Sequence, residues 1–162
     1  LCVAKGLTGG YLPLAATLTT QRVFEAFLGT AAEQKTFFHG HTYTGNPLAC
    51  AAALANLELF ERERTLERMK PAVDALAQGL EKIAALPNVA EVRRRGLMVG
   101  VELKGHPPHQ RTGLQVCRAA RRHGVLLRPL GDVVVLMPPL SLTVDEAKLL
   151  TSAVHECIAS LP

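Results

Sequence analysis

Lys5 is the first residue whose neighbours suggest chemistry. It follows a short apolar run over residues 1–4 that is typical of a buried strand, and glycines follow it at positions 6, 9 and 10. Glycines let a bulky ligand approach the backbone, and partial desolvation favours the neutral, nucleophilic form of an amine. A lysine that forms a Schiff base needs this setting. An ordinary surface lysine at a turn fits the same pattern.

The loop "FFHGHTYTGNP", residues 37–47, is the second candidate. Gly40 permits close backbone approach, and Thr42 and Thr44 offer hydroxyl groups. Asn46 is a typical helix cap, and the positive end of a helix dipole favours an anion such as phosphate. The pattern also fits a capped helix start with no ligand.

Two histidines of this loop raise the question of a metal. His39 and His41 are two residues apart, and no cysteine or carboxylate lies beside them at the spacing of metal ligands. We therefore expect no metal site here.

Arg128 is the third candidate. It ends the apolar segment 125–128 and directly precedes Pro129. A planar guanidinium in this place is either a residue at the rim of the fold or a clamp for a carboxylate. The residues alone leave both interpretations open.

The elements that would position these candidates divide into two groups. Residues 1–61 read as a strand ending at Lys5, a second short strand over 12–18, a helix near 21–29 and a long helix from Pro47. The long helix, "LACAAALANLELFE", is Ala-rich and apolar nearly all round, which is typical of a helix buried between layers.

From Arg62 the sequence becomes charged and amphipathic, which indicates a domain boundary and a second domain over 62–162. This part predicts three helices on a small sheet, an α+β unit. Strands are expected over 89–96, 97–103, 125–130 and 133–140, and a left-handed helix end at Gly124. Its helices show apolar stripes and a capping box: Val73, Leu76, Leu80 and Ile83 in one, Ala147, Leu150, Val154 and Ile158 in another, with Thr143 and Glu146 as the box.

Composition excludes several classes of protein. The chain has 162 residues and a net charge of +4, but aromatic residues are only 4% and tryptophan is absent, which disfavours a nucleic-acid binder. No apolar stretch is long enough for a membrane span, and no secretory signal is evident. Four widely spaced cysteines indicate reduced thiols and a cytoplasmic location. A start at leucine inside an apparent strand suggests part of a longer protein.

Three stretches together carry a family resemblance. They are "AKGLTGGYLPLAATLTT", "FFHGHTYTGNPLACAAALANLELFE" and "GVLLRPLGDVVVLMPP". In this order and spacing they resemble the C-terminal half of class III, fold type I, pyridoxal-phosphate-dependent aminotransferases, over essentially the whole chain. The resemblance implies an α/β fold, with residues 1–61 ending the large cofactor-binding domain and residues 62–162 forming a small C-terminal α+β domain.

The resemblance also implies residue roles. Lys5 would form the Schiff base with pyridoxal 5'-phosphate and move a proton between the substrate and cofactor carbons. Gly40 would contact the substrate, while His41 and Thr42 would bind the cofactor phosphate across the interface of a homodimer. Arg128 would hold the substrate carboxylate.

More narrowly, the stretches resemble the branch of the family that acts in biotin biosynthesis, converting 8-amino-7-oxononanoate to 7,8-diaminononanoate. His41 stands where the enterobacterial pattern has proline, so the amino donor is either S-adenosylmethionine or lysine. Other class III aminotransferases, acting on ornithine, 4-aminobutyrate or β-alanine, and a non-catalytic dimerisation lobe are the alternatives. The family's remaining cofactor residues lie upstream of such a segment, so we expect the 162-residue chain to be inactive alone.

Overall fold

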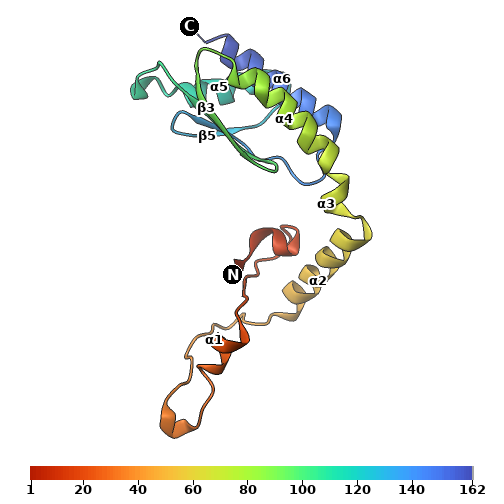
Figure 1. The fold of residues 1–162 in the computed structure, drawn as a ribbon, viewed down its shortest axis with the longest axis vertical. Helices are drawn as coiled ribbons and strands as arrows, with labels where there is room; N and C mark the ends of the chain where they lie inside the picture. Colours follow the sequence, from red (N-terminus) through yellow and green to blue (C-terminus); the bar gives the residue numbers. More distant parts are fainter. Residues whose placement is uncertain (162) are drawn as a thin grey trace. The chain divides into compact units, whose positions relative to one another are not determined.

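The computed structural model describes residues 1–161 of the chain (Figure 1). The chain divides into two compact units, Leu1–Arg64 and a second that begins at Thr65. Each unit combines helices with a sheet, so the α/β prediction is confirmed at this coarse level. None of the helices within residues 1–161 has both the length and the apolar character needed to span a bilayer.

The first unit contains short elements and one long helix. The two strands pair antiparallel, Cys2 with Thr17 and Val3 with Ala16. In chain order the elements are β1 (Cys2–Val3), the 3-10 helix η1 (Lys5–Thr8), β2 (Ala16–Thr17), α1 (Gln21–Glu25), the 3-10 helix η2 (Ala31–Glu33) and α2 (Pro47–Arg62).

The prediction of a buried strand before Lys5 is wrong. The strand has only two residues, of which Cys2 is exposed and Val3 half-buried. A two-stranded ladder of this length has too little surface to cover its own apolar side chains.

The prediction that α2 is buried between layers is also wrong for this unit. Only Ala49 and Ala53 of the helix are buried, whereas Leu48 and Leu54 are 71% and 61% exposed. The first unit provides no broad sheet against which a helix that is apolar on every side could pack.

The second unit is built on a four-stranded sheet with the order β3-β4-β6-β5, in which every neighbouring pair is antiparallel. Helices α4, α5 and α6 lie on one side of it (Figure 1). The elements are α3 (Thr65–Arg68), α4 (Lys70–Ala84), β3 (Val89–Arg95), β4 (Met98–Leu103), the 3-10 helix η3 (Pro108–Gln110), α5 (Thr112–Ala120), the 3-10 helix η4 (Arg121–His123), β5 (Arg128–Leu130), β6 (Val133–Leu136) and α6 (Val144–Ala159).

One hydrophobic core fills the space between this sheet and its helices. Alternate residues of β4 and β6 point into it, as the two-residue period of a strand requires. The apolar stripes predicted for the helices supply the other side of the core, and Val73 packs at its edge. The fully buried members include Leu76, Ile83, Val101, Val134, Leu136, Val154 and Ile158.

Strand β5 is shorter than the predicted segment 125–130, and the register explains why. Arg128 pairs with Val135, and the ladder does not continue toward residues 125–127. On the partner strand the chain reaches Pro138 and Pro139, which have no N–H to donate to a ladder. Residues 125–127 therefore run beside the sheet without joining it.

Candidate functional site

Lys5 is the first residue of η1 and has a left-handed backbone, with φ at 52°. A residue with a Cβ pays about 1–2 kcal/mol for this conformation. The side chain is exposed, and its amine makes no hydrogen bond or ion pair with the part of the chain that the structure describes. Lys5 thus presents a free primary amine from a strained position.

The expected desolvation of Lys5 is not produced by this unit. The strand before it is too short to bury the side chain, and the glycines at positions 6 and 10 face open space. Open space around these glycines does agree with the expectation that a bulky group can come close to the backbone here.

Helix α2 fastens the turn that follows Lys5. The side-chain amide of Asn56 donates from Nδ2 to the carbonyl oxygens of Gly6, at 2.9 Å, and of Leu7, at 3.1 Å. Gly9, with φ at 62°, lies so close that an added Cβ would be 3.3 Å from Asn56 Oδ1. The position of Lys5 is therefore tied to a residue 51 places later in the sequence.

Asn56 is not among the residues predicted from the sequence to act in the site. A signal was available, because Asn56 is the one amide in an otherwise nearly apolar stretch of helix, and a helix-interior asparagine is less favourable than alanine or leucine. Its partners could not be identified from the sequence, since they lie about 50 residues away.

The second candidate, the loop around His41, forms a tight turn. The backbone N–H of His41 donates to Thr44 Oγ1 at 3.0 Å, and the N–H of Tyr43 donates to His41 Nδ1 at 3.1 Å. Because Nδ1 accepts a hydrogen bond, the neutral imidazole carries its proton on Nε2, where it can donate to a ligand.

Thr42 and Gly40 leave room beside that turn. The Thr42 hydroxyl has no hydrogen-bond partner among the described residues. A Cβ added to Gly40 would meet only Thr44 Oγ1, at 4.0 Å. The loop therefore offers an imidazole N–H and a free hydroxyl next to open space, which are suitable donors for an anion.

The helix start beside this loop is already capped. Asn46 Oδ1 accepts hydrogen bonds from the N–H groups of Leu48, at 3.0 Å, and Ala49, at 3.1 Å, and Pro47 takes the first helical position, as predicted. These two N–H groups are consequently not available to a phosphate, so any anion bound here would depend on His41 and Thr42.

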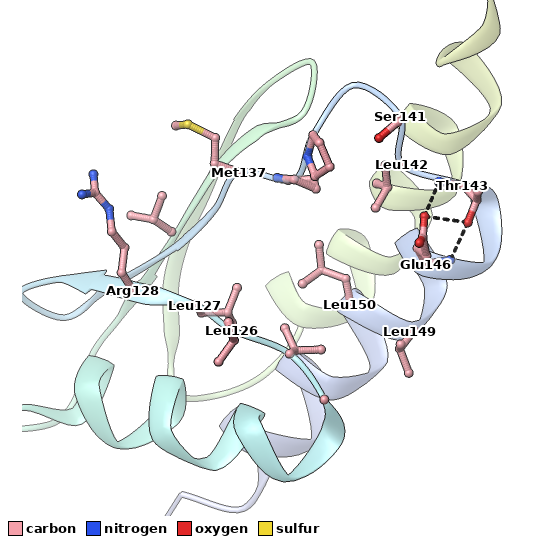
Figure 2. Close-up of a pocket in the computed structure, with 15 residues that line it drawn as sticks. Leu126, Leu127, Arg128, Met137, Ser141, Leu142, Thr143, Glu146, Leu149 and Leu150 are labelled. Atoms are coloured by element: carbon pink, nitrogen blue, oxygen red, sulfur yellow. Dashed lines mark hydrogen bonds between the residues drawn. The ribbon is translucent and has the colours of Figure 1, made fainter. Parts of the chain in front are cut away.

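Arg128 lies at one end of a groove of about 670 Å³ in the second unit (Figure 2). Its guanidinium has no ion pair or hydrogen bond within residues 1–161. Apolar side chains dominate the middle of the groove, and the hydrogen-bonded pair Thr143 and Glu146 closes the other end. The apolar lining comprises Val125, Leu126, Leu127, Val135, Met137, Pro138, Pro139, Leu142, Leu149 and Leu150.

This groove suits a ligand with an apolar body and one carboxylate. A guanidinium with free N–H donors binds a carboxylate through two parallel hydrogen bonds, and the leucines would cover the hydrocarbon part. An exposed arginine without a partner fits a rim residue as well as a clamp, so the role of Arg128 stays a prediction, to which the groove adds an apolar surface beside the guanidinium.

The three candidates are distributed over the two units, with Lys5 and the loop at 40–42 in the first. No hydrogen bond or ion pair of the described residues links Lys5 to the loop at 40–42, and Arg128 belongs to the second unit. Within residues 1–161, no three His, Cys, Asp or Glu side chains gather as a metal site would require.

Comparison with known proteins gives concordant results. Residues 1–158 match the family described as aminotransferase class-III. The adenosylmethionine-8-amino-7-oxononanoate aminotransferase of Nitratidesulfovibrio vulgaris is 53% identical over 99% of this chain and 31% of its own length. The crystal structure of the enzyme of that name from Methanocaldococcus jannaschii is 46% identical, with a TM-score of 0.92 over 97% of this chain and 37% of that one.

A second solved structure is also similar. It is a PLP-bound amine transaminase from an uncultivated Pseudomonas species, 40% identical, with a TM-score of 0.85 over 98% of this chain and 37% of that one. The chain spans about a third of the length of the curated relatives it matches, from 31% to 36% for three of them.

Proposed function

The chain belongs to the class III aminotransferase family, and on that premise we propose that it carries the lysine and substrate clamp of an enzyme of biotin biosynthesis. The proposed reaction converts 8-amino-7-oxononanoate to 7,8-diaminononanoate, with S-adenosylmethionine or lysine as amino donor. The observation that carries the proposal is the unpaired Arg128 at the end of an apolar groove, which fits a substrate with an apolar chain and a carboxylate.

The cofactor of the proposed enzyme is pyridoxal 5'-phosphate. The free amine of Lys5 is the group that reacts with an aldehyde, and the Nε2–H of His41 and the hydroxyl of Thr42 suit a phosphate. When bound, this cofactor withdraws electrons from the substrate carbon and so allows a proton to leave it.

Lys5 has two roles in this proposal. Its Nζ would hold the cofactor covalently until a substrate amine takes its place. Once released, Nζ would carry a proton between the substrate carbon and the cofactor side, in opposite directions in the two half-reactions.

Arg128 and Gly40 would orient the substrate. The guanidinium of Arg128 would bind the carboxylate, and the groove leucines would exclude water from the hydrocarbon chain. Gly40 would leave space for the substrate beside the His41 turn.

The proposed domain organisation assigns residues 1–61 to the end of the large cofactor-binding domain and residues 62–162 to a small α+β domain. The exposed leucines of α2 support this assignment, because the remainder of a large domain would cover them. We also propose a cytoplasmic homodimer in which His41 and Thr42 reach the cofactor of the neighbouring subunit.

An amine transaminase of broader specificity is the second candidate function. It is favoured by the similarity to the PLP-bound amine transaminase, at 40% identity. The two candidates differ in the keto substrate, so activity toward 8-amino-7-oxononanoate and toward simple ketones distinguishes them.

Borohydride trapping tests the proposed role of Lys5. The holoenzyme is reduced with borohydride, digested and examined by mass spectrometry, and the expected result is a pyridoxyl label on Lys5. The Lys5→Ala variant should carry no label and should lose transamination, because alanine has no amine that could replace Nζ. Lys35, which is paired with Glu33 at 2.9 Å, gives a matched control through Lys35→Ala.

Substrate assays then identify the reaction. Production of 7,8-diaminononanoate with either donor supports the biotin function, whereas activity on simple ketones alone supports the second candidate. A wild-type protein labelled at another residue, or at none, contradicts the catalytic assignment and favours a non-catalytic dimerisation lobe.

A further inference from the structure

Asn56 is the only side chain of α2 with a hydrogen bond to the turn that carries Lys5, among the residues that the structure describes. Its Nδ2 donates to Gly6 O at 2.9 Å and to Leu7 O at 3.1 Å, which are the two carbonyl groups directly after the lysine. One amide group thus fixes two successive peptide units. This arrangement restricts the rotation of the backbone on which Lys5 stands.

The turn is adapted to receive Asn56. Gly9 has a left-handed backbone, and a Cβ there would lie 3.3 Å from Asn56 Oδ1, closer than an ordinary contact. The far end of the turn is held as well, because Thr8 is buried and its hydroxyl donates to Leu12 O. The turn is therefore hydrogen-bonded to α2 at Gly6 and Leu7, while Thr8 holds its far end through Leu12.

Lys5 needs such support. Its left-handed φ of 52° is unfavourable for a residue with a side chain, and its own amine has no partner among the described residues. Without the hydrogen bonds of Asn56, the turn would keep only its own backbone hydrogen bonds and the bond from the Thr8 hydroxyl to Leu12 O.

We infer that Asn56 is a positioning residue, which holds the Lys5 backbone so that Nζ reaches the reacting carbons in one orientation. The inference rests on the proposed function. Asn56 does not touch the reacting atoms in this arrangement, and it acts only through the turn.

If Asn56 served only the stability of α2, its loss would be seen along the helix and not specifically at η1. Asparagine inside a helix is less favourable than alanine, so replacing it should leave α2 intact or slightly stabilise it. The cost of losing Asn56 should therefore appear at η1 and in the step that Lys5 performs, and not in the stability of the helix.

The test compares Asn56→Ala and the isosteric Asn56→Asp with the control Glu58→Ala in the holoenzyme. Glu58 lies on the same helix and is exposed. We expect kcat to fall about tenfold in both Asn56 variants, with KM for each substrate changed by less than about twofold, since misplacement of Nζ affects proton transfer after the substrate is bound.

Hydrogen exchange supplies a readout independent of activity. The amide of Gly9 donates to Gly6 O at 3.0 Å within the turn, and it should exchange about tenfold faster in the Asn56 variants. The amide of Cys50, which begins the hydrogen bonding of α2 by donating to Asn46 O at 3.0 Å, should keep its rate.

Two outcomes overturn the inference. One is an Asn56 variant whose kcat and Gly9 exchange match those of Glu58→Ala. The other is general acceleration of exchange along α2, which assigns Asn56 a structural role only. If the wild-type protein carries no label at Lys5, the proposed function fails instead, and that result is separate from both of these.

Discussion

At the scale of single residues, Lys5 and Arg128 are both free of partners within the described chain, but they are held differently. Lys5 stands on a strained turn that Asn56 fixes from a distance, whereas Arg128 starts a strand whose ladder with Val135 fixes its backbone. A reactive amine must meet a carbon within bonding distance, so its placement is exacting. A guanidinium that binds a carboxylate tolerates more movement because its side chain is long.

Replacement of Arg128 tests its proposed role. We expect Arg128→Ala to raise KM for 8-amino-7-oxononanoate about 10- to 100-fold, the value of a charged hydrogen-bonded pair, while cofactor binding stays unchanged. Steady-state kinetics and a cofactor titration measure the two effects. Arg118→Ala is the control, because Arg118 lies outside the groove. An unchanged KM would exclude Arg128 as the clamp.

At the scale of elements, α6 begins with the capping box that the sequence predicts. The Thr143 N–H and hydroxyl donate to Glu146 Oε2 at 2.8 and 2.9 Å, and the Glu146 N–H donates to Thr143 Oγ1 at 3.2 Å. The backbone N–H of Thr143, and then its hydroxyl, lower the pKa of the Glu146 carboxyl. Thr143 and Glu146 also line one end of the groove beside Arg128. The same hydrogen bonds therefore cap the start of α6 and shape that end of the groove.

The lowered pKa of Glu146 predicts a pH dependence of stability. A carboxyl whose folded pKa is lowered stabilises the fold above its unfolded pKa, near 4.3, and loses that contribution as the pH falls through the folded pKa. We expect wild type to melt at a higher temperature than Glu146→Gln at pH 7, and the difference to shrink below about pH 4. Thermal melts of both proteins from pH 7 to pH 3 measure this. A difference that is constant with pH would contradict it.

At the scale of the whole molecule, the two units differ in how their apolar residues are covered. The second unit closes a continuous core between its sheet and helices, including Cys117 and Cys157. The first leaves large apolar side chains of α2 and of the loop at 37–43 exposed. The second unit therefore has a hydrophobic core of its own, while the first presents apolar surface that suits a larger assembly.

The buried thiols test the closed core of the second unit. Burial raises the pKa of Cys117 and of Cys157, so less of the reactive thiolate is present, and the surrounding core blocks reagents. We expect iodoacetamide at pH 8 to alkylate both at least about tenfold more slowly in the native protein than in the denatured protein. Peptide mass spectrometry follows each site. Equal rates in the two states would show that this core opens freely.

The sequence by itself determined the elements whose signals are local. These signals depend on neighbours within a few positions along the chain. They are the periods of the apolar residues in α4, α6 and β4, the helix caps at Asn46 and Thr143, and the left-handed helix end at Gly124. The residue types of Lys5, Thr42 and Arg128 suggested a chemistry and the family resemblance suggested one for His41, and these roles stay predictions.

Only the tertiary structure decided which other parts of the chain those helices and strands pack against. Burial of β1 and α2 was predicted from composition, yet burial depends on whether another layer covers a face, and no local pattern contains that information. The same holds for Asn56, whose carbonyl partners are about 50 residues distant, and for the groove beside Arg128, which two strands and α6 form together. Contacts between distant segments depend on the path of the whole chain, and therefore only the three-dimensional structure identifies them.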